Sequence, residues 1–145
     1  MHPHAALTLH DLPDEGATRA LGHWLGTQVQ PGDLLFLQGN LGAGKTTLAS
    51  GFLAGRGWTN SVRSPTYPIL RTYPLAPPVH HLDLYRLGGL EEVLGLDIEA
   101  LMGGPDILLV EWPDRMEGQF PPHWIVELEV SGVDRRTAVV KRMRP

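Results

Sequence analysis

Nine residues, GNLGAGKTT at positions 39–47, combine three glycines with one lysine and two threonines directly after the apolar run LLFLQ. The pattern G-x-x-x-x-G-K-[ST] is matched by Gly39, Gly44, Lys45 and Thr46. Glycine lets successive backbone N–H groups turn inward around an anion, and a helix that begins near Lys45 adds the positive end of its dipole. The lysine can reach the outer phosphates of a nucleotide, and the threonine hydroxyl can bind Mg²⁺. The stretch therefore predicts a phosphate-binding loop.

All nine residues of this loop are expected to contact the nucleotide, and Lys45 is also expected to act in catalysis. The chain holds 17 glycines, which makes the glycine part of the pattern less specific, but it has only two lysines, Lys45 and Lys141. A glycine-rich turn without a ligand is the alternative. The predicted nucleotide-binding residues of the loop are Gly39, Asn40, Leu41, Gly42, Ala43, Gly44, Lys45, Thr46 and Thr47.

A phosphate-binding loop needs a carboxylate to help hold Mg²⁺, and open α/β sheets place ligands at the carboxyl ends of neighbouring strands. Residues 107–110 are four aliphatic residues followed by Glu111, and Pro113 then ends the strand. We therefore expect Thr46 and Glu111 to be the metal ligands, with Glu111 binding directly or through a water molecule. An acid that merely caps the strand is the alternative.

The second acid, Asp83, lies in the run VHHLDLYRL, which begins as a strand. We expect this carboxylate to orient an attacking water or to support the metal ligand, since a cation offsets the repulsion between two acids. Asp83 could instead pair with Arg86 or with a histidine. His80 and His81 are adjacent, so their side chains point to opposite faces of the strand and cannot easily share one metal.

The elements that position these residues follow from hydrophobic spacing. Pro13-Asp14-Glu15 reads as a helix start, because apolar residues then recur at helical spacing as far as Val29. Continuous apolar runs at 34–37 and 107–110 predict strands buried on both faces. The other expected elements are an edge strand at 7–9, a helix from the loop to Gly55 or Gly57, a proline-rich loop with one irregular edge strand at 59–78, a strand at 79–84, a helix at 90–96, and a hairpin of 124–130 with 137–140.

Strands that alternate with helices place the chain in the α/β class. We predict a single-domain P-loop NTPase fold with a mostly parallel central sheet flanked by helices and a C-terminal hairpin. The length of 145 residues and the hydrophobic content of 42% fit one core, so we predict a single domain over 1–145 that carries the phosphate-binding loop, with 1–6 mobile.

Composition excludes several classes of function. The chain has no cysteine, which removes disulfides and thiolate metal sites. No apolar run approaches the roughly 20 residues needed to span a bilayer, and the N-terminus lacks the pattern of a signal peptide. We therefore expect a cytoplasmic protein without a membrane partner. The formal net charge of −4 argues mildly against nucleic acid as the main ligand, and DNA is not expected as a partner.

The end of the chain is an exception to this acidic balance. From Asp134 onward five basic residues face one acid, which describes either a solvated terminal strand or a docking strip for an acidic partner or RNA. The basic residues are Arg135, Arg136, Lys141, Arg142 and Arg144.

Four motifs taken together resemble the TsaE (YjeE) family of bacterial P-loop ATPases, which takes part in making threonylcarbamoyladenosine in tRNA. They are GNLGAGKTT at 39–47, SPTY at 64–67, HHLDLYRL at 80–87 and VEWP at 110–113, in that order. The resemblance covers essentially the whole chain. The loop motif alone indicates only a nucleotide, whereas DLYRL followed by VEWP is much more specific.

The resemblance implies roles for particular residues. Thr66 in SPTY would sense the γ-phosphate, and Asp83 would be needed for ATP hydrolysis to ADP. Thr46 and Glu111 would bind Mg²⁺, and Trp112 would lie near the site. The family also places an early helix start and a late arginine near the nucleotide, which here fall around Gly16 and Arg135. The implied partners are the TsaD and TsaB proteins, with tRNA contacted indirectly.

Three other functions stay open from the residues. A small-molecule P-loop kinase is the main alternative, although the chain is short for one and shows no arginine-rich lid segment. A GTPase-like switch would need a guanine-reading N-K-x-D type segment, which the sequence lacks. The third alternative is a non-catalytic module that only holds nucleotide, and unchanged partner function in Lys45→Ala would favour it.

Overall fold

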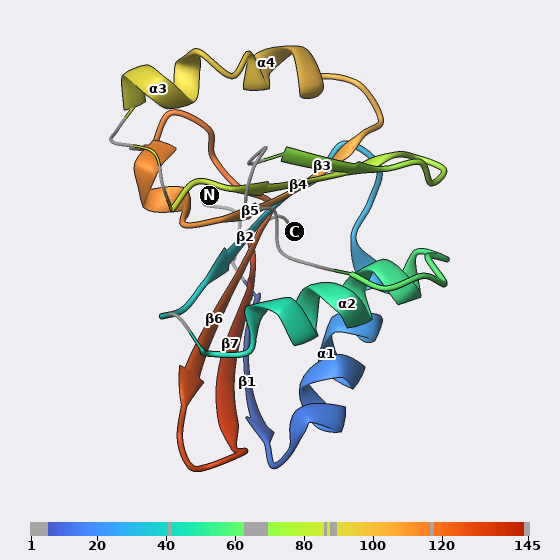
Figure 1. Ribbon diagram of the computed structural model, residues 1–145, viewed down its shortest axis with the longest axis vertical. Helices are drawn as coiled ribbons and strands as arrows, with labels where there is room; N and C mark the ends of the chain where they lie inside the picture. Colours follow the sequence, from blue (N-terminus) through green and yellow to red (C-terminus); the bar gives the residue numbers. More distant parts are fainter. Residues whose placement is uncertain are drawn as a thin grey trace.

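A seven-stranded mixed sheet in the order β1-β7-β6-β2-β5-β4-β3 forms the centre of the computed structural model, which describes residues 6–40, 42–62, 70–85, 87, 90–116 and 118–143 (Figure 1). Strands β6, β2, β5 and β4 run parallel, and antiparallel strands flank them on both sides. The strands are β1 (Ala6–Leu12), β2 (Leu34–Gln38), β3 (Leu70–Tyr73), β4 (Val79–Asp83), β5 (Ile107–Glu111), β6 (Trp124–Val130) and β7 (Arg136–Arg142).

Helices cover both faces of this sheet. Helices α1 (Glu15–Gln28) and α2 (Lys45–Gly55) lie on one face, and α3 (Leu90–Leu94), α4 (Ile98–Leu101) and the 3₁₀ helix η1 (Pro113–Met116) lie on the other (Figure 1). The central strands are therefore buried on both sides, which explains why β2 and β5 are runs of aliphatic residues. The predicted fold class is confirmed, and the parallel pairing is confined to the centre of the sheet.

The register of the parallel strands brings the two predicted acids together. Asp83 is the last residue of β4 and pairs in the ladder with Glu111, the last residue of β5. Glu111 pairs on its other side with Leu37 of β2, one residue before that strand ends. Since parallel strands end at the same edge of the sheet, both carboxylates lie beside the start of the loop that follows β2.

Helices α1 and α2 pack backbone against backbone. A Cβ atom on Gly51 would overlap the carbonyl oxygen of Arg19, and one on Gly22 would overlap the carbonyl oxygen of Leu48. Only glycine permits this approach, because any side chain would hold the two helices further apart. The glycines of this interface are Gly22, Gly26, Gly51 and Gly55.

Most of the expected elements are confirmed, with different ends. The edge strand predicted at 7–9 runs over the seven residues of β1, and the helix start at Asp14 is confirmed because its side chain accepts a hydrogen bond from Ala17 N at 2.8 Å. The irregular edge strand of the proline-rich segment is β3. The short helices α4 and η1 were not expected, since four residues are too few to show a helical period.

Two expectations fall on segments that are only partly described. Of residues 1–6, expected to be mobile, only Ala6 is described, and it begins β1. Of the proline-rich loop, residues 63–69 lie outside the described residues.

Replacing Gly51 with Ala tests the close approach of the helices. The added methyl group meets backbone, which cannot rotate aside, so we expect G51A to lower the free energy of unfolding by about 3 kcal/mol. Urea unfolding measures the change. Gly104→Ala is the control, because a Cβ there meets nothing within 4 Å. Equal midpoints for G51A and G104A would contradict the packing described here.

Candidate functional site

The segment between β2 and α2 has the backbone of an anion-binding loop. Gly42 and Gly44 have φ angles of 82° and 100°, in the left-handed region that favours glycine. Gly44 is the N-cap of α2 and, as a glycine, has no side chain that could cap the first N–H groups of that helix. The N-terminal N–H groups and the positive end of the α2 dipole therefore face the same space. This arrangement fits a phosphate group.

A cavity of about 370 Å³ lies against this loop and gathers most of the predicted site residues. Loop and helix residues line one side of it, and the ends of β4 and β5 contribute the two acids. Its lining residues are Gly42, Gly44, Lys45, Thr46, Thr47, Asp83, Glu111, Trp112 and Arg136.

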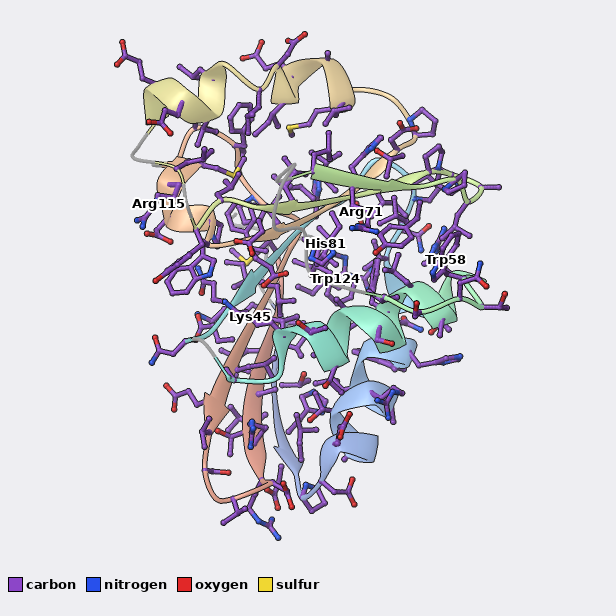
Figure 2. The ribbon with its side chains drawn as sticks, viewed as in Figure 1. Lys45, Trp58, Arg71, His81, Arg115 and Trp124 are labelled. Carbon is purple, nitrogen blue, oxygen red and sulfur yellow. The ribbon has the colours of Figure 1, made fainter. Side chains whose placement is uncertain are left out.

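Lys45, labelled in Figure 2, is the first residue of α2. Its side chain is only 6% exposed. Its Nζ lies 3.8 Å from Glu111 Oε1 and 4.2 Å from the centre of the Trp112 ring. Within the described residues, this buried ammonium has no hydrogen-bond acceptor. A buried ammonium without an acceptor is unfavourable unless a ligand supplies one. The lysine therefore fits an anionic ligand that completes its hydrogen bonds.

Glu111 is buried and forms a close pair with His81. The sequence had suggested a histidine only as a possible partner of Asp83. His81 Nε2 lies 2.7 Å from Glu111 Oε2, and both side chains are almost fully buried. The neighbouring His80 points to the opposite face of β4 and bonds to Asp106 and Thr72. The prediction that the two histidines do not share a metal agrees with these contacts.

Asp83 is the more accessible of the two acids. Its Oδ1 accepts a hydrogen bond from Tyr85 N at 3.0 Å. Burial raises the pKa of the Asp83 carboxyl above its usual range, and the nearby charge of Glu111 also raises it, whereas the Tyr85 N–H, Lys45 and His81 act in the opposite direction. A carboxyl with a raised pKa beside a cavity is typical of a functional position.

Trp112 follows Glu111 with a strained backbone. Its φ angle is 58°, which is unusual for a bulky residue, and its ring packs on Tyr85 with centroids 4.8 Å apart. The strain turns the indole toward the cavity, where it contacts Lys45. The structure thus places Trp112 at the candidate site, where the sequence motif had suggested it.

The arginine that contacts the loop is Arg136, whereas Arg135 was the arginine expected near the nucleotide. Arg136 donates from Nε to the carbonyl oxygen of Ala43 at 3.1 Å and from Nη2 to that of Gly42 at 3.2 Å. Arg135 instead pairs with Asp11 on β1, with the two groups 2.8 Å apart. Arg136 is the first residue of β7 and Arg135 precedes the strand, so the two adjacent side chains have different partners.

The start of α1 borders a second cavity of about 210 Å³ beside the first. Gly44, Thr47 and Arg136 line both cavities. Gly16 itself does not line it, but its neighbour Glu15 does, together with Thr18 and Asp134. The early helix start and the segment around Arg136 therefore both border the loop.

Other predicted residues lie outside the described residues or away from the cavity. Thr66 and Leu41 fall in segments that the structure does not describe. Among the described basic residues after Asp134, Lys141 pairs with Glu127 at 2.8 Å, Arg142 lies over Trp124 and Arg135 pairs with Asp11, whereas Arg136 borders the cavity. These contacts favour the interpretation of the tail as a terminal strand.

The donor set of the cavity fits a magnesium ion of the kind found with nucleotides. In the part of the chain that the structure describes, no group of three or more His, Cys, Asp or Glu side chains is placed to hold a metal ion. Mg²⁺ at phosphate sites instead uses one or two carboxylates with phosphate oxygens and water. Thr46, Asp83 and Glu111 around one cavity are compatible with that arrangement.

Over the same described residues, the helices are all too short or too polar to cross a membrane.

The parallel central strands, the loop from β2 into α2, and Lys45 and Thr46 at the start of that helix define an α/β protein of the P-loop fold class. The chain is similar to a crystal structure of YdiB from Bacillus subtilis, with a TM-score of 0.76 and 29% sequence identity over 97% of this chain and 88% of that one. The family described as Threonylcarbamoyl adenosine biosynthesis protein TsaE matches residues 12–139. The chain belongs to the TsaE family.

Relatives named for the same role cover most of the chain. The sequence is 39% identical over 126 residues to tRNA threonylcarbamoyladenosine biosynthesis protein TsaE of Bacillus subtilis (strain 168), covering 86% of this chain and 77% of that protein. It is 44% identical over 110 residues to the protein of the same name from Synechocystis sp., covering 72% and 69% respectively. The resemblance inferred from the motifs is confirmed.

The raised pKa of Asp83 predicts a stability change that depends on pH. The folded state holds the Asp83 proton more tightly than the unfolded state, so the ionised carboxylate at neutral pH destabilises the fold, and stability is regained as pH falls through the raised pKa. We expect Asp83→Asn to raise the melting temperature at neutral pH, with a difference that shrinks in acidic buffer. Thermal unfolding at both pH values measures it, with Glu99→Gln as an exposed control. A lower melting temperature for D83N at neutral pH would contradict this account.

The contacts of Arg136 predict that it holds the loop in shape. Each hydrogen bond from a charged donor contributes on the order of 1.5 kcal/mol or more, so we expect Arg136→Ala to speed amide hydrogen exchange at residues 42–47 by about 10-fold or more. Hydrogen–deuterium exchange with mass spectrometry measures the rates. Arg135→Ala should leave the loop unchanged, because its partner is Asp11. Equal exchange in the two variants would remove this role from Arg136.

Proposed function

We propose that this chain is a Mg²⁺-dependent ATPase required for threonylcarbamoyl modification of the tRNA adenosine next to the anticodon. It acts through the TsaD–TsaB complex and hydrolyses ATP slowly on its own. Membership of the TsaE family supports the pathway. The cavity at the loop supports the use of a nucleotide.

The observation that carries this proposal is the buried ammonium of Lys45. It lies beneath an anion-binding loop, and the described residues offer it no hydrogen-bond acceptor. A nucleotide phosphate supplies the missing acceptor and the negative charge together. A structural lysine would instead be paired closely or exposed to water.

The residues of the cavity divide the work of phosphoryl transfer to water. The loop N–H groups and Lys45 bind the β- and γ-phosphates and stabilise the charge that develops on their oxygens. Thr46 and Glu111 would hold Mg²⁺, which neutralises further phosphate charge when it is bound. Asp83 accepts a hydrogen bond from the attacking water and so orients it. Thr66 contacts the γ-phosphate in this proposal, although it lies outside the described residues.

Slow turnover in isolation follows from the positions of the arginines. Among the described residues that line the cavity, the one arginine is Arg136, and its guanidinium donates to the loop carbonyl groups. Arg71 is exposed on β3, and Arg63 and Arg86 lie outside the described residues. An arginine finger contributes roughly 10³–10⁵ in turnover in related chemistry. A partner that completes the site would raise turnover by orders of magnitude.

The proposal also includes the cellular location and the partners of the protein. We place the protein in the cytoplasm, where tRNA is modified, with TsaD and TsaB as its direct partners and tRNA contacted through them. DNA and membranes have no part in the proposal. Contacts within the chain that occupy the described residues of the basic tail agree with an indirect role of tRNA.

ATP turnover with Mg²⁺, measured for the protein alone and then with purified TsaD–TsaB, tests the proposal. We expect slow hydrolysis that rises with the pair, and a loss of about 100-fold or more in Lys45→Ala, because that change removes a cation from the developing charge. Asp83→Ala and Glu111→Ala should also lose most of the activity. Lys141→Ala is the matched control, since it replaces the only other lysine of the chain.

Two results would overturn the proposal. Fast hydrolysis by the isolated protein would remove the need for an activating partner. Turnover that stays unchanged when TsaD–TsaB is added would separate this ATPase activity from that complex, and phosphate transfer to a small acceptor would then favour the kinase alternative.

A further inference from the structure

His81 lies directly behind the carboxylate that faces Lys45. The imidazole, labelled in Figure 2, lies on β4 and is completely buried. Its Nε2 lies 2.7 Å from Glu111 Oε2. Glu111 Oε1, the other oxygen of the same carboxylate, lies 3.8 Å from Lys45 Nζ. The three side chains form a buried row from His81 through Glu111 to Lys45.

The contact between His81 and Glu111 determines which imidazole nitrogen carries a proton. An ionised carboxylate can only accept hydrogen bonds, so the short contact requires a proton on Nε2. His81 Nδ1 is buried and has no hydrogen-bond partner among the described residues. The hydrogen bond to Glu111 is therefore the one polar interaction seen for this ring, and it restrains rotation of the carboxylate.

The separation between Lys45 and Glu111 is larger than a direct charge-assisted hydrogen bond. Such bonds between nitrogen and oxygen are about 2.7–2.9 Å long, whereas Lys45 Nζ and Glu111 Oε1 are 3.8 Å apart. In a buried site, a lysine and a carboxylate would close this gap unless something held one of them back. His81 holds the carboxylate on its far side.

We propose that His81 is a positioning residue that keeps the Glu111 carboxylate away from Lys45, so that the lysine ammonium stays available to an anionic ligand. Without the His81 hydrogen bond, Glu111 turns toward Lys45 and forms a direct ion pair. That pair competes with phosphate for the lysine and also reorients the proposed metal ligand. The effect on phosphate and metal binding rests on the proposed function. The competition between His81 and Lys45 for the Glu111 carboxylate is a property of the chain alone.

Two substitutions of similar polarity separate this role from simple packing. The amide nitrogen of Gln reaches about as far as Nε2 of His, so His81→Gln keeps a donor for Glu111. The amide of Asn reaches only about as far as Nδ1, so His81→Asn loses that donor. Each is also made in the Glu111→Gln background, where no carboxylate is left to turn toward Lys45.

Lysine NMR tests the proposal in the protein without nucleotide. The chain has only two lysines, so protein labelled with ¹³C,¹⁵N-lysine gives two sets of side-chain signals, and Lys141→Ala assigns them. We expect H81N to shift the Lys45 Cε and Nζ signals as the ion pair forms, and H81Q to leave them close to wild type. In the Glu111→Gln background, H81N should have little effect. Unchanged Lys45 signals in H81N, or the same shift in both backgrounds, would overturn the proposal.

Affinity for ADP provides the functional measurement. Outer partners of metal and phosphate ligands typically change affinity by about 10–100-fold, so we expect H81N to weaken ADP binding by about 10-fold or more and H81Q to restore most of it. Calorimetry measures the affinity, and the loss should disappear in the Glu111→Gln background. Equal affinities for H81N and H81Q would count against the role of His81. If the wild-type protein does not bind ADP, the proposed function fails, and the lysine signals still decide whether His81 controls Glu111.

Discussion

The direct packing of α1 on α2 is the contact on which the geometry of the site depends. Glycines at the interface remove the side chains that would separate the helices, so the two backbones touch. The first turn of α1 then lies beside the first turn of α2, and Glu15 and Thr18 line a cavity together with Gly44 and Thr47. With ordinary side chains between the helices, this wall would move outward and the loop would be open on that side.

The charged groups at the site are arranged for a ligand and contribute little to the stability of the fold. Buried ion pairs are weak evidence for stability, because removing charges from water offsets much of their attraction. Lys45 and Glu111 are held apart beyond hydrogen-bonding distance, and Trp112 adopts a strained backbone next to them. The two apolar cores on either side of the sheet offset these unfavourable features. A strained residue beside a buried ammonium that lacks a hydrogen-bond acceptor among the described residues is typical of a functional site.

Much of the fold followed from the sequence because its signals are local. Continuous aliphatic runs identified β2 and β5, and the glycine, lysine and threonine spacing identified the loop between a strand and a helix. Glu111 and Asp83 could be placed at one edge because strands of a parallel sheet end together, whatever their order. These inferences need only the order of residues along the chain.

The remaining features depend on contacts between distant segments, which one sequence does not display. Whether Arg135 or Arg136 faces the loop depends on where β7 begins and how it pairs with β6, and one sequence does not show this. The pairing of His81 with Glu111 requires β4 to lie next to β5, and hydrophobic spacing does not give strand order. The glycines of α1 and α2 read in the sequence as weak helix formers, and only the packing explains them.

The order of the strands has a consequence for how the protein is made. Strand β2, which leads into the loop, pairs with β5 and β6, so Leu34 meets Leu108 and Leu35 meets Trp124. Strand β1, near the beginning of the chain, pairs with β7 near its end. During synthesis the loop emerges from the ribosome long before the strands that fix it, and contacts so distant in sequence form slowly. A ligand that binds only the folded loop would therefore favour chains in which β5 and β6 have already paired with β2.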